Sequence, residues 1–346
     1  MVQQVLVIHP GGLGDILLAL PALRALRATY EKAGLVLISR SDVGKLLLSC
    51  AEIQYSIPLE GPAFTALIAG EELMQEGVLD LVRKTELAVC WMTDADGQLS
   101  RSLRALGIRE VIVQSPFQGM ESSQHHSDRF LASLRNIVRP PDRTGHLQIP
   151  SPIEDQGRGV LDALVGPSAK KVALHPGSGS RHKCATPGLF VNAVRQLSVT
   201  GYRPIIIGGP ADDESVSIVD AQLDAGIPVV TDLDLLSMAG LLAHVSLFVG
   251  HDSGLTHLAA ALHRPTVAIF GPTSAERWAP RGKHVKIVSG ETCLCEGWEA
   301  VQACRQKPCL QVSEEELMKA CTTLLTQESD HVKPLDNRDA SPCSSR

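Results

Sequence analysis

The chain has 346 residues, 44% of them hydrophobic and 20% charged, so it can fold as two globular domains and is neither a disordered tail nor a fibre. Its formal net charge of −6 argues against general nucleic-acid binding, which depends on basic surfaces. Aromatic residues, at 3%, are too few for a base- or sugar-stacking platform. We therefore expect no nucleic-acid partner.

The apolar runs and the N-terminus predict a cytoplasmic protein. No run approaches the ~18 apolar residues that a membrane-spanning helix needs. The opening MVQQVLVIHPGG lacks the basic segment of a secretory signal. In the cytoplasm the nine cysteines should be reduced thiols.

A strand, a glycine-containing turn and a helix open the chain. Residues 5–8 form a short β-branched run, Pro10 and the following glycines end it, and an apolar helical pattern covers residues 16–28. Pro21 lies inside that pattern and predicts a kink or a late helix start. Further strands are expected at residues 35–39, 87–91 and 111–113. These runs are continuously apolar, which is typical of a parallel sheet covered on both faces.

The middle of the chain loses this pattern. Residues 139–169 contain five prolines, so we expect an N-terminal domain at 1–150 and a linker at 151–170, with a short helix around residues 160–164. A C-terminal domain at 171–327 and a disordered tail at 328–346 would follow.

The second half repeats the opening. A strand at residues 171–174 runs into His175-Pro176-Gly177, as the first strand runs into His9-Pro10-Gly11. Further strands are expected at residues 204–208, 247–249, 266–270 and 285–288, and helices at 189–197, 213–222, 235–243, 255–262 and 313–325. Strands and helices alternate in both halves, which predicts an α/β fold with two doubly wound parallel sheets.

Three polar turns follow predicted strands, where open α/β sheets bind ligands. They read HPGGLGD (9–15), HPGSGSRHK (175–183) and GHDSGLTH (250–257). Asp15 closes the first turn at a helix N-terminus. Its position alone favours a helix cap over the alternative role of a general base.

The second and third turns have the composition of anion sites. Gly177, Ser178 and Gly179 would let backbone amides approach a phosphate or diphosphate, with Lys183 supplying charge. The alternative is a tight turn with a solvated basic loop. In the third turn, amides near Ser253 could form a second anion cradle. The glycine spacing around Ser253 is not that of a hydrolase nucleophile.

Three other sequence patterns are weaker indications of function. Residues 11–14 resemble a dinucleotide turn but lack its third glycine, which disfavours an oxidoreductase. Asp94 and Asp96 are interpreted as a turn, so no metal is expected there. The cysteines at 293, 295, 304 and 309 are expected to be free thiols, with a zinc site or a disulfide as the alternative.

Five segments together resemble family 9 glycosyltransferases, the heptosyltransferases of lipopolysaccharide inner-core synthesis and their relatives. They are GDILLALPALRAL (14–26), ALHPGSGSRHK (173–183), GGPADDE (208–214), VGHDSGLTHLAAAL (249–262) and FGPTSAERWAP (270–280). The resemblance covers about residues 3–325 in the family's motif order. It implies a GT-B fold with two Rossmann-like domains facing a cleft. It also implies inverting, metal-independent transfer from a nucleotide sugar, typically ADP-heptose, without a cofactor.

The resemblance also assigns roles. The family's proposed base falls on Asp15 and its diphosphate-binding lysine on Lys183. The acid that holds the donor ribose falls on Glu214, or on Asp212 if the turn is shifted by one step. The remaining donor-binding positions are Gly177, Ser178, Asp252, Ser253, Gly254 and His257.

The N-terminal domain would bind the acceptor, and here the sequence departs from the family. The family usually reads D-x-Q-G where this chain has residues 94–97 as Asp-Ala-Asp-Gly, and it has a tryptophan just after the position of Lys183, where this chain has Cys184. Lipopolysaccharide acceptors are anionic, so the acceptor side needs cations. We expect Gly12, Arg101 and Arg129 to bind the acceptor, with His125 and His126 beside them, and both arginines to face the cleft near Asp15. Solvated surface positions are the alternative.

The expected partners are a nucleotide-diphosphate sugar and a lipid-linked or soluble glycan acceptor, with a peripheral contact at the inner face of the cytoplasmic membrane. A same-fold transferase with another nucleotide sugar or acceptor is one alternative. A non-catalytic nucleotide-diphosphate-binding protein is another, but such a protein would not need the carboxylate of Asp15.

Overall fold

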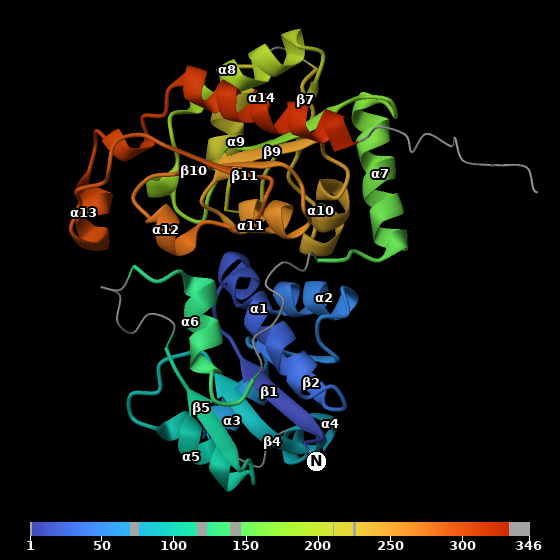
Figure 1. Cartoon of the computed structure of the whole chain (residues 1–346), viewed down its shortest axis with the longest axis vertical. Coiled ribbons are helices and arrows are strands. Elements are labelled where there is room, and N and C mark those ends of the chain that lie inside the picture. Colours follow the sequence, from blue (N-terminus) through green and yellow to red (C-terminus); the bar gives the residue numbers. More distant parts are fainter. Residues whose placement is uncertain are drawn as a thin grey trace, which may run out of the picture.

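The computed structural model describes residues 2–69, 76–115, 123–138, 147–209, 211–223 and 226–331. It contains two parallel sheets, each covered by helices on both faces, stacked one above the other as two domains (Figure 1). The predicted α/β fold with two doubly wound sheets is therefore confirmed. No helix in these ranges is long and apolar enough to span a membrane.

The N-terminal domain is built on a five-stranded sheet with the order β3-β2-β1-β4-β5. Its strands are β1 (Gln4–Ile8), β2 (Gly34–Ser39), β3 (Tyr55–Pro58), β4 (Thr85–Cys90) and β5 (Glu110–Val113). Its helices are α1 (Leu13–Thr29), α2 (Ser41–Ser49), α3 (Pro62–Ala69), α4 (Glu76–Arg83), α5 (Gln98–Ala105) and α6 (His126–Ser133). The central strand β1 is buried along its whole length, as its continuous apolar run predicts.

The C-terminal domain is built on a six-stranded sheet with the order β11-β10-β9-β6-β7-β8. Its strands are β6 (Lys171–His175), β7 (Arg203–Ile207), β8 (Val229–Val230), β9 (Leu247–His251), β10 (Thr266–Phe270) and β11 (Val285–Ser289). Its helices are α7 (Ser151–Val165), α8 (Pro187–Val199), α9 (Asp213–Asp220), α10 (Leu235–Leu242), α11 (Gly254–Ala261), α12 (Ala275–Trp278), α13 (Gly297–Ala303) and α14 (Glu314–His331), with the short 3-10 helices η1 (Arg181–Lys183) and η2 (Pro308–Leu310).

Several expectations from the sequence need correction. The helix α1 begins at Leu13 and continues through Pro21, so the late start is wrong. The segment expected to be a linker is mostly the 15-residue helix α7, which packs against α10. This packing is close, since a Cβ on Gly157 would lie 2.1 Å from the carbonyl carbon of Gly240. The strands β3 and β8 were not expected, because β3 ends in a proline and β8 has only two residues.

The C-terminal boundary also differs. The helix α14 continues to His331, past the expected start of the tail at 328, and residues 332–346 lie outside the described ranges. The domain limits at residues 150, 170 and 327 remain predictions.

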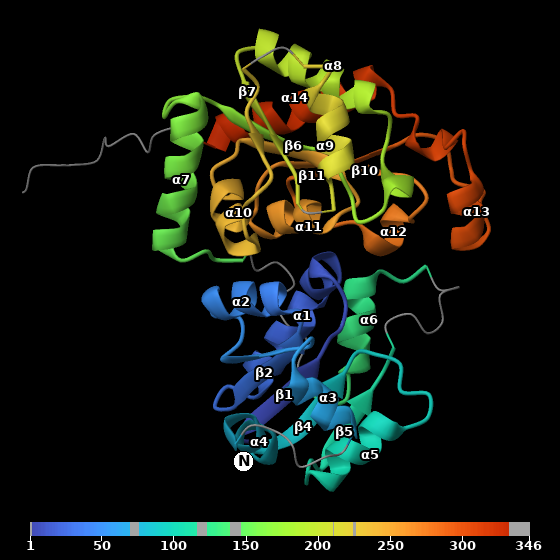
Figure 2. The same ribbon diagram turned by 180° about the vertical axis from the view of Figure 1, so that it is seen from behind.

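The two domains meet along pairs of helices. The helix α1 lies against α11, and α2 against α10 (Figures 1 and 2). One cluster of buried apolar side chains continues from α1 and α2 into α10 and α11. The N-terminus of α1, and with it the first polar turn, is therefore held against the C-terminal domain.

Candidate active site

The three polar turns lie close to one another at the domain boundary. A Cβ on Gly14 would lie 3.2 Å from the His257 ring, and a Cβ on Gly254 would lie 3.0 Å from Leu13. Larger residues at these two glycines would push apart the ends of α1 and α11. The charges of His257 and Lys183, both in the C-terminal domain, act on the carboxyl group of Asp15.

Asp15 is half-buried at the start of α1, and its Oδ2 accepts a hydrogen bond of 2.9 Å from the Gly12 amide. The helix-cap interpretation is therefore confirmed. Burial raises the pKa of Asp15 above its usual value, and the Gly12 hydrogen bond and the charges of His257 and Lys183 offset only part of this rise. A carboxylate with a raised pKa, facing the other domain, is also suited to accept a proton.

Lys183 and Asp252 form the charged centre opposite Asp15. The Lys183 Nζ donates to Asp252 Oδ2 at 2.8 Å, and the Thr273 hydroxyl donates to the same oxygen at 2.7 Å. His257 Nε2 lies 3.9 Å from Asp252 Oδ1. Burial alone would raise the pKa of Asp252, but interactions with His257 and Lys183 outweigh it and hold that pKa well below its usual range.

A buried chain of hydrogen bonds supports this centre. His175 Nε2 lies 2.9 Å from Asp212 Oδ2, and His175 Nδ1 lies 3.2 Å from Ser253 Oγ. Asp212 also accepts from the Gly209 amide at 2.8 Å. Burial would raise the pKa of Asp212, but these interactions, with His175 first among them, lower it overall.

Asp212, His175 and Ser253 resemble the acid, histidine and serine of a hydrolase triad, but the Ser253 hydroxyl already caps a helix. Ser253 is only 9% exposed, and its Oγ caps α11 by accepting from the Thr256 amide. The arrangement is therefore a structural network that fixes the third turn. The sequence did not single out His175 or Thr273, although the repeated His-Pro-Gly turn and the Phe-Gly-Pro-Thr segment contain them.

The donor-binding residues predicted in the second turn have mainly structural contacts. The Ser178 hydroxyl donates to the backbone oxygen of Asp252 at 2.8 Å and so ties the second turn to the third. Gly177 is packed against Asp212, with 2.0 Å from its Cβ position to Oδ1. Glu214 is exposed in the first turn of α9, whereas Asp212 is buried, so Glu214 is the more accessible of the two candidate ribose ligands.

The structure separates the two candidate acceptor arginines. Arg101 is exposed on α5, and its Nη1 donates to the Asp96 backbone oxygen at 2.8 Å. Both ribbon views place α5 at the end of the N-terminal domain away from the C-terminal domain (Figures 1 and 2). The expectation that Arg101 lies near Asp15 is wrong, because the strand-to-helix turn carries it away from the boundary. Arg129 is buried on α6, which packs against α1.

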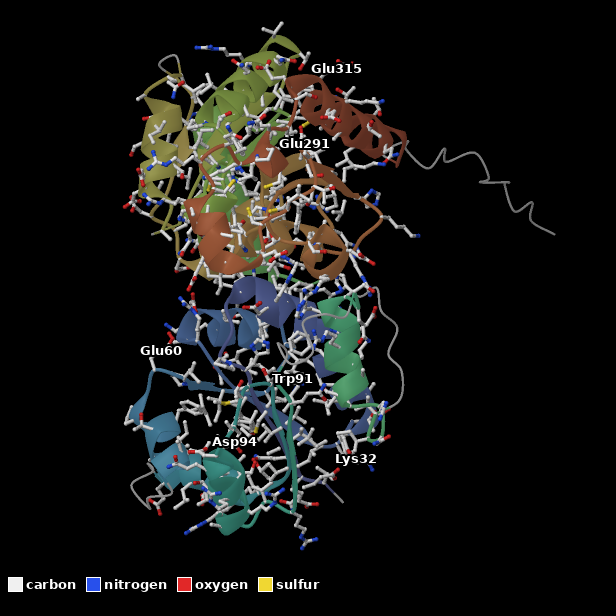
Figure 3. All side chains as sticks on the ribbon, turned by 90° about the vertical axis from the view of Figure 1, so that its left-hand side faces the viewer. Lys32, Glu60, Trp91, Asp94, Glu291 and Glu315 are labelled. Atoms are coloured by element: carbon white, nitrogen blue, oxygen red, sulfur yellow. The ribbon has the colours of Figure 1, made fainter. Side chains whose placement is uncertain are left out.

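Asp94 and Asp96 cap α5, as the turn interpretation predicts. Asp94 accepts from the amides of Leu99 and Ser100 at 3.0 Å each, and Asp96 accepts from the Gln98 amide at 3.1 Å. Figure 3 shows Asp94 farther from the C-terminal domain than Trp91, which follows the same strand.

Four thiols gather near α13. Burial and the neighbouring thiols of Cys293 and Cys304 raise the pKa of Cys295 to about 11, and the same two neighbours act on Cys309. Every cysteine in the described ranges is free, so the disulfide alternative fails there. Within those ranges no group of three or more His, Cys, Asp or Glu side chains is arranged to hold a metal ion.

Comparisons with known proteins indicate which family the chain resembles. Residues 148–309 match the family model for glycosyltransferase family 9 (heptosyltransferase). The chain is 28% identical over 113 residues to lipopolysaccharide heptosyltransferase 3 of Escherichia coli, which covers 32% of this chain and 33% of that protein. It is 27% identical over 149 residues to lipopolysaccharide heptosyltransferase 2 of E. coli K12, covering 40% and 42%. The chain thus spans well under half the length of these relatives.

Solved structures share the whole two-domain fold. A family 9 glycosyl transferase from Veillonella parvula superposes with a TM-score of 0.77 at 18% identity, covering 94% of this chain and 98% of that one. The E. coli ADP-heptose lipopolysaccharide heptosyltransferase II superposes with a TM-score of 0.72 at 19% identity, covering 94% and 100%. The fold is therefore of the GT-B type. Residues 148–309 thus match the family 9 domain, and the chain as a whole is similar in fold to solved glycosyltransferases of that family.

Proposed function

We propose that the protein is an inverting glycosyltransferase that moves a heptose or similar sugar from a nucleotide-diphosphate donor to a lipopolysaccharide inner-core or related glycan. ADP-heptose is the first candidate donor. The observation that carries this proposal is the Asp15 carboxyl of one domain facing Lys183, Asp252 and His257 of the other. In this arrangement Asp15 would be a base on the acceptor side and Lys183 a cation on the donor side.

In the proposed reaction, Asp15 accepts the proton of an acceptor hydroxyl as that oxygen attacks the anomeric carbon. The bond between the anomeric carbon and the diphosphate oxygen breaks on the opposite face, so the configuration inverts. The electron pair leaves with the diphosphate, whose added negative charge Lys183 and the amides at Ser253 and Gly254 stabilise. Such preorganised donors are typically worth ~3–4 kcal/mol each in the transition state.

Lys183 can leave Asp252 to bind the donor diphosphate, because the Asp252 carboxylate has further partners. Asp252 also accepts from Thr273 and lies near His257, so it stays compensated when the lysine turns toward a phosphate oxygen. Glu214 would bind the donor ribose, and Gly177, Ser178 and Asp212 would hold the turn that receives the nucleotide.

We propose that these residues perform the transfer without a metal ion, because Lys183 supplies the positive charge that the leaving group needs. EDTA should then leave the rate unchanged within about twofold, the scale of a ~0.5 kcal/mol effect. Inhibition by EDTA that added Mg²⁺ or Mn²⁺ reverses would contradict this part of the proposal.

A melting screen tests the donor. ADP-heptose should raise the melting temperature of the protein, whereas UDP- and GDP-sugars should not, because a ligand at 100 times its Kd adds about 2.7 kcal/mol to the free energy of unfolding. A shift with a UDP- or GDP-sugar alone would favour the same-fold transferase with another donor. A shift without transfer to any glycan would favour a non-catalytic nucleotide-binding protein.

For the cellular location we propose the cytoplasm, with peripheral contact at the inner membrane where a lipid-linked acceptor would be presented. Fractionation of cells would place the protein in the soluble or the membrane-associated fraction. Recovery from the periplasm would overturn this location.

A further inference from the structure

The helices α6 and α12 join the two domains beside the candidate active site. His125 Nε2 lies 2.9 Å from the Ala279 backbone oxygen, and the His126 ring stacks on Trp278 at 3.5 Å between centroids. Arg281 binds Asp128 through two hydrogen bonds of 2.9 and 2.7 Å. This junction therefore has a defined geometry built from side chains of both domains.

Two arginines in this junction have buried nitrogens without partners. Arg129 on α6 is only 9% exposed, and its Nη1 has no hydrogen-bond partner within the described ranges. The Nε and Nη2 atoms of Arg277 on α12 are likewise buried and without partners there. Buried donors are normally satisfied, and buried charges are normally paired, because leaving them otherwise costs their hydration energy.

The positive charges of the two guanidinium groups also repel each other. Burial, and then the neighbouring charge of Arg277, lower the pKa of Arg129. Burial and the charges of the two arginines lower the pKa of His126 to about 4, so this ring does not add a third charge near neutral pH. The carboxylate of Asp128 in this junction is paired with Arg281, and neither Arg129 nor Arg277 forms an ion pair within the described ranges.

Two other arginines of the protein, unlike this pair, are bound to carboxylates. Arg24 is partly buried and binds Glu52 through its Nε at 3.1 Å and through its Nη2. Arg281, a few residues beyond Arg277, is paired with Asp128. An arginine pair with buried nitrogens that the described part of the chain leaves unbalanced is suited to receive a negatively charged group of a ligand.

We propose that Arg129 and Arg277 form an oxyanion subsite across the domain boundary, which binds a phosphate or carboxylate group of the acceptor substrate. Guanidinium groups suit this class because each can donate two parallel hydrogen bonds to one oxyanion. The natural ligand rests on the proposed transferase function, whereas binding of an oxyanion does not depend on it.

The position of the subsite suits an acceptor. Phe130, next to Arg129, packs against the His9 ring at 5.4 Å, and His9 and Asp15 both border Gly11. The α6 half of the subsite thus belongs to the domain that carries Asp15. The subsite is separate from the Lys183–Asp252 pair that the donor diphosphate would use. An anion bound by both arginines would also hold the two domains in one relative orientation.

The experiment measures the melting temperature with inorganic phosphate, against chloride at equal ionic strength. Phosphate should raise the melting temperature of the wild-type protein. Arg129→Gln and Arg277→Gln should each weaken the apparent phosphate affinity at least tenfold. Arg104→Gln, an exposed position on α5, is the matched control and should leave it unchanged. Lys183→Met removes the cation of the proposed donor site and should leave most of the phosphate effect in place.

The ligand-free variants provide a second readout. At low salt, Arg129→Gln and Arg277→Gln should melt no lower than the wild type, because each removes the repulsion between the two arginines. Replacing phosphate by glucuronate distinguishes a phosphate-binding from a carboxylate-binding subsite. If both glutamine variants keep the full phosphate effect, or if only Lys183→Met abolishes it, the subsite is wrong. If the wild-type protein binds phosphate through the two arginines but transfers no sugar to any glycan, the proposed function is wrong and the oxyanion subsite stands.

Discussion

The two His-Pro-Gly turns follow the strands β1 and β6, yet their histidines have opposite surroundings. His9 packs against the rings of Trp91 and Phe130, accepts from the Gly11 amide at 3.1 Å, and leaves Nε2 buried without a partner in the described chain. His175 has both ring nitrogens within hydrogen-bond distance of polar side chains, Asp212 and Ser253. The same short motif therefore serves an apolar site in one domain and a polar network in the other.

The length of chain between each turn and its helix explains the difference in chemistry. In the first domain α1 starts only two residues after Gly11, which places Asp15 at the helix N-terminus beside the boundary. In the second domain α8 starts ten residues after Gly177, at Pro187, and this longer loop presents Lys183. In the proposed reaction one turn would supply a base and the other a cation, and substitutions in the two turns can test that division.

The largest expected effect is at the first turn. Asp15→Asn should lower the turnover number ~100-fold or more, since general-base catalysis typically contributes 10²–10⁴-fold. Its amide oxygen can still accept from the Gly12 amide, so folding and the donor-dependent melting shift should persist. Because burial raises the pKa of Asp15, wild-type activity should fall as the pH is lowered through that raised value. Unchanged turnover in the variant would leave Asp15 with the helix-cap role alone.

The second turn should respond differently. Lys183→Met should reduce kcat/KM by ~10²-fold, as loss of one donor to a developing anion does, and should also weaken donor binding. The comparison requires this split, with Asp15→Asn sparing donor affinity and Lys183→Met lowering it. Titration calorimetry with the nucleotide diphosphate measures the affinity of each variant. Equal donor affinity in both would remove the assignment of base and cation to separate domains.

The histidines of the two turns predict a pH effect on stability. Burial lowers the pKa of His9 from 6.5 to about 4, so the folded protein binds fewer protons than the unfolded chain between these values. The contribution of neutral His9 to the free energy of unfolding is therefore largest above pH ~6.5. It decreases by about 3 kcal/mol in total as the pH is lowered toward 4. His9→Asn should remove this part of the acid destabilisation in urea titrations at pH 7 and pH 4.5. An unchanged difference between the two pH values would contradict it.

Much of this site could be predicted from the sequence, because short motifs determine local backbone. The positions of Asp15, Lys183 and Asp252 after parallel strands were enough to place them at one edge of each sheet. The partners of each side chain were not predictable, since they depend on contacts between distant segments. Thr273 reaches Asp252 over 21 residues, and the opposition of Arg129 and Arg277 requires the two domains to be docked.

The smallest expected effect is at Arg101, where the sequence and the structure disagree. Arg101 is exposed on α5 and bonded to its own turn, so Arg101→Ala should change the acceptor KM by less than about twofold, the range of a ~0.5 kcal/mol surface substitution. Arg129→Ala, at a buried position on α6, which packs against α1, should raise the same KM at least tenfold and leave the donor KM unchanged. Steady-state kinetics with one glycan acceptor measures both variants. A large effect at Arg101 would mean that the acceptor extends along the N-terminal domain as far as α5, and the α6 junction would then be only one part of a longer acceptor surface.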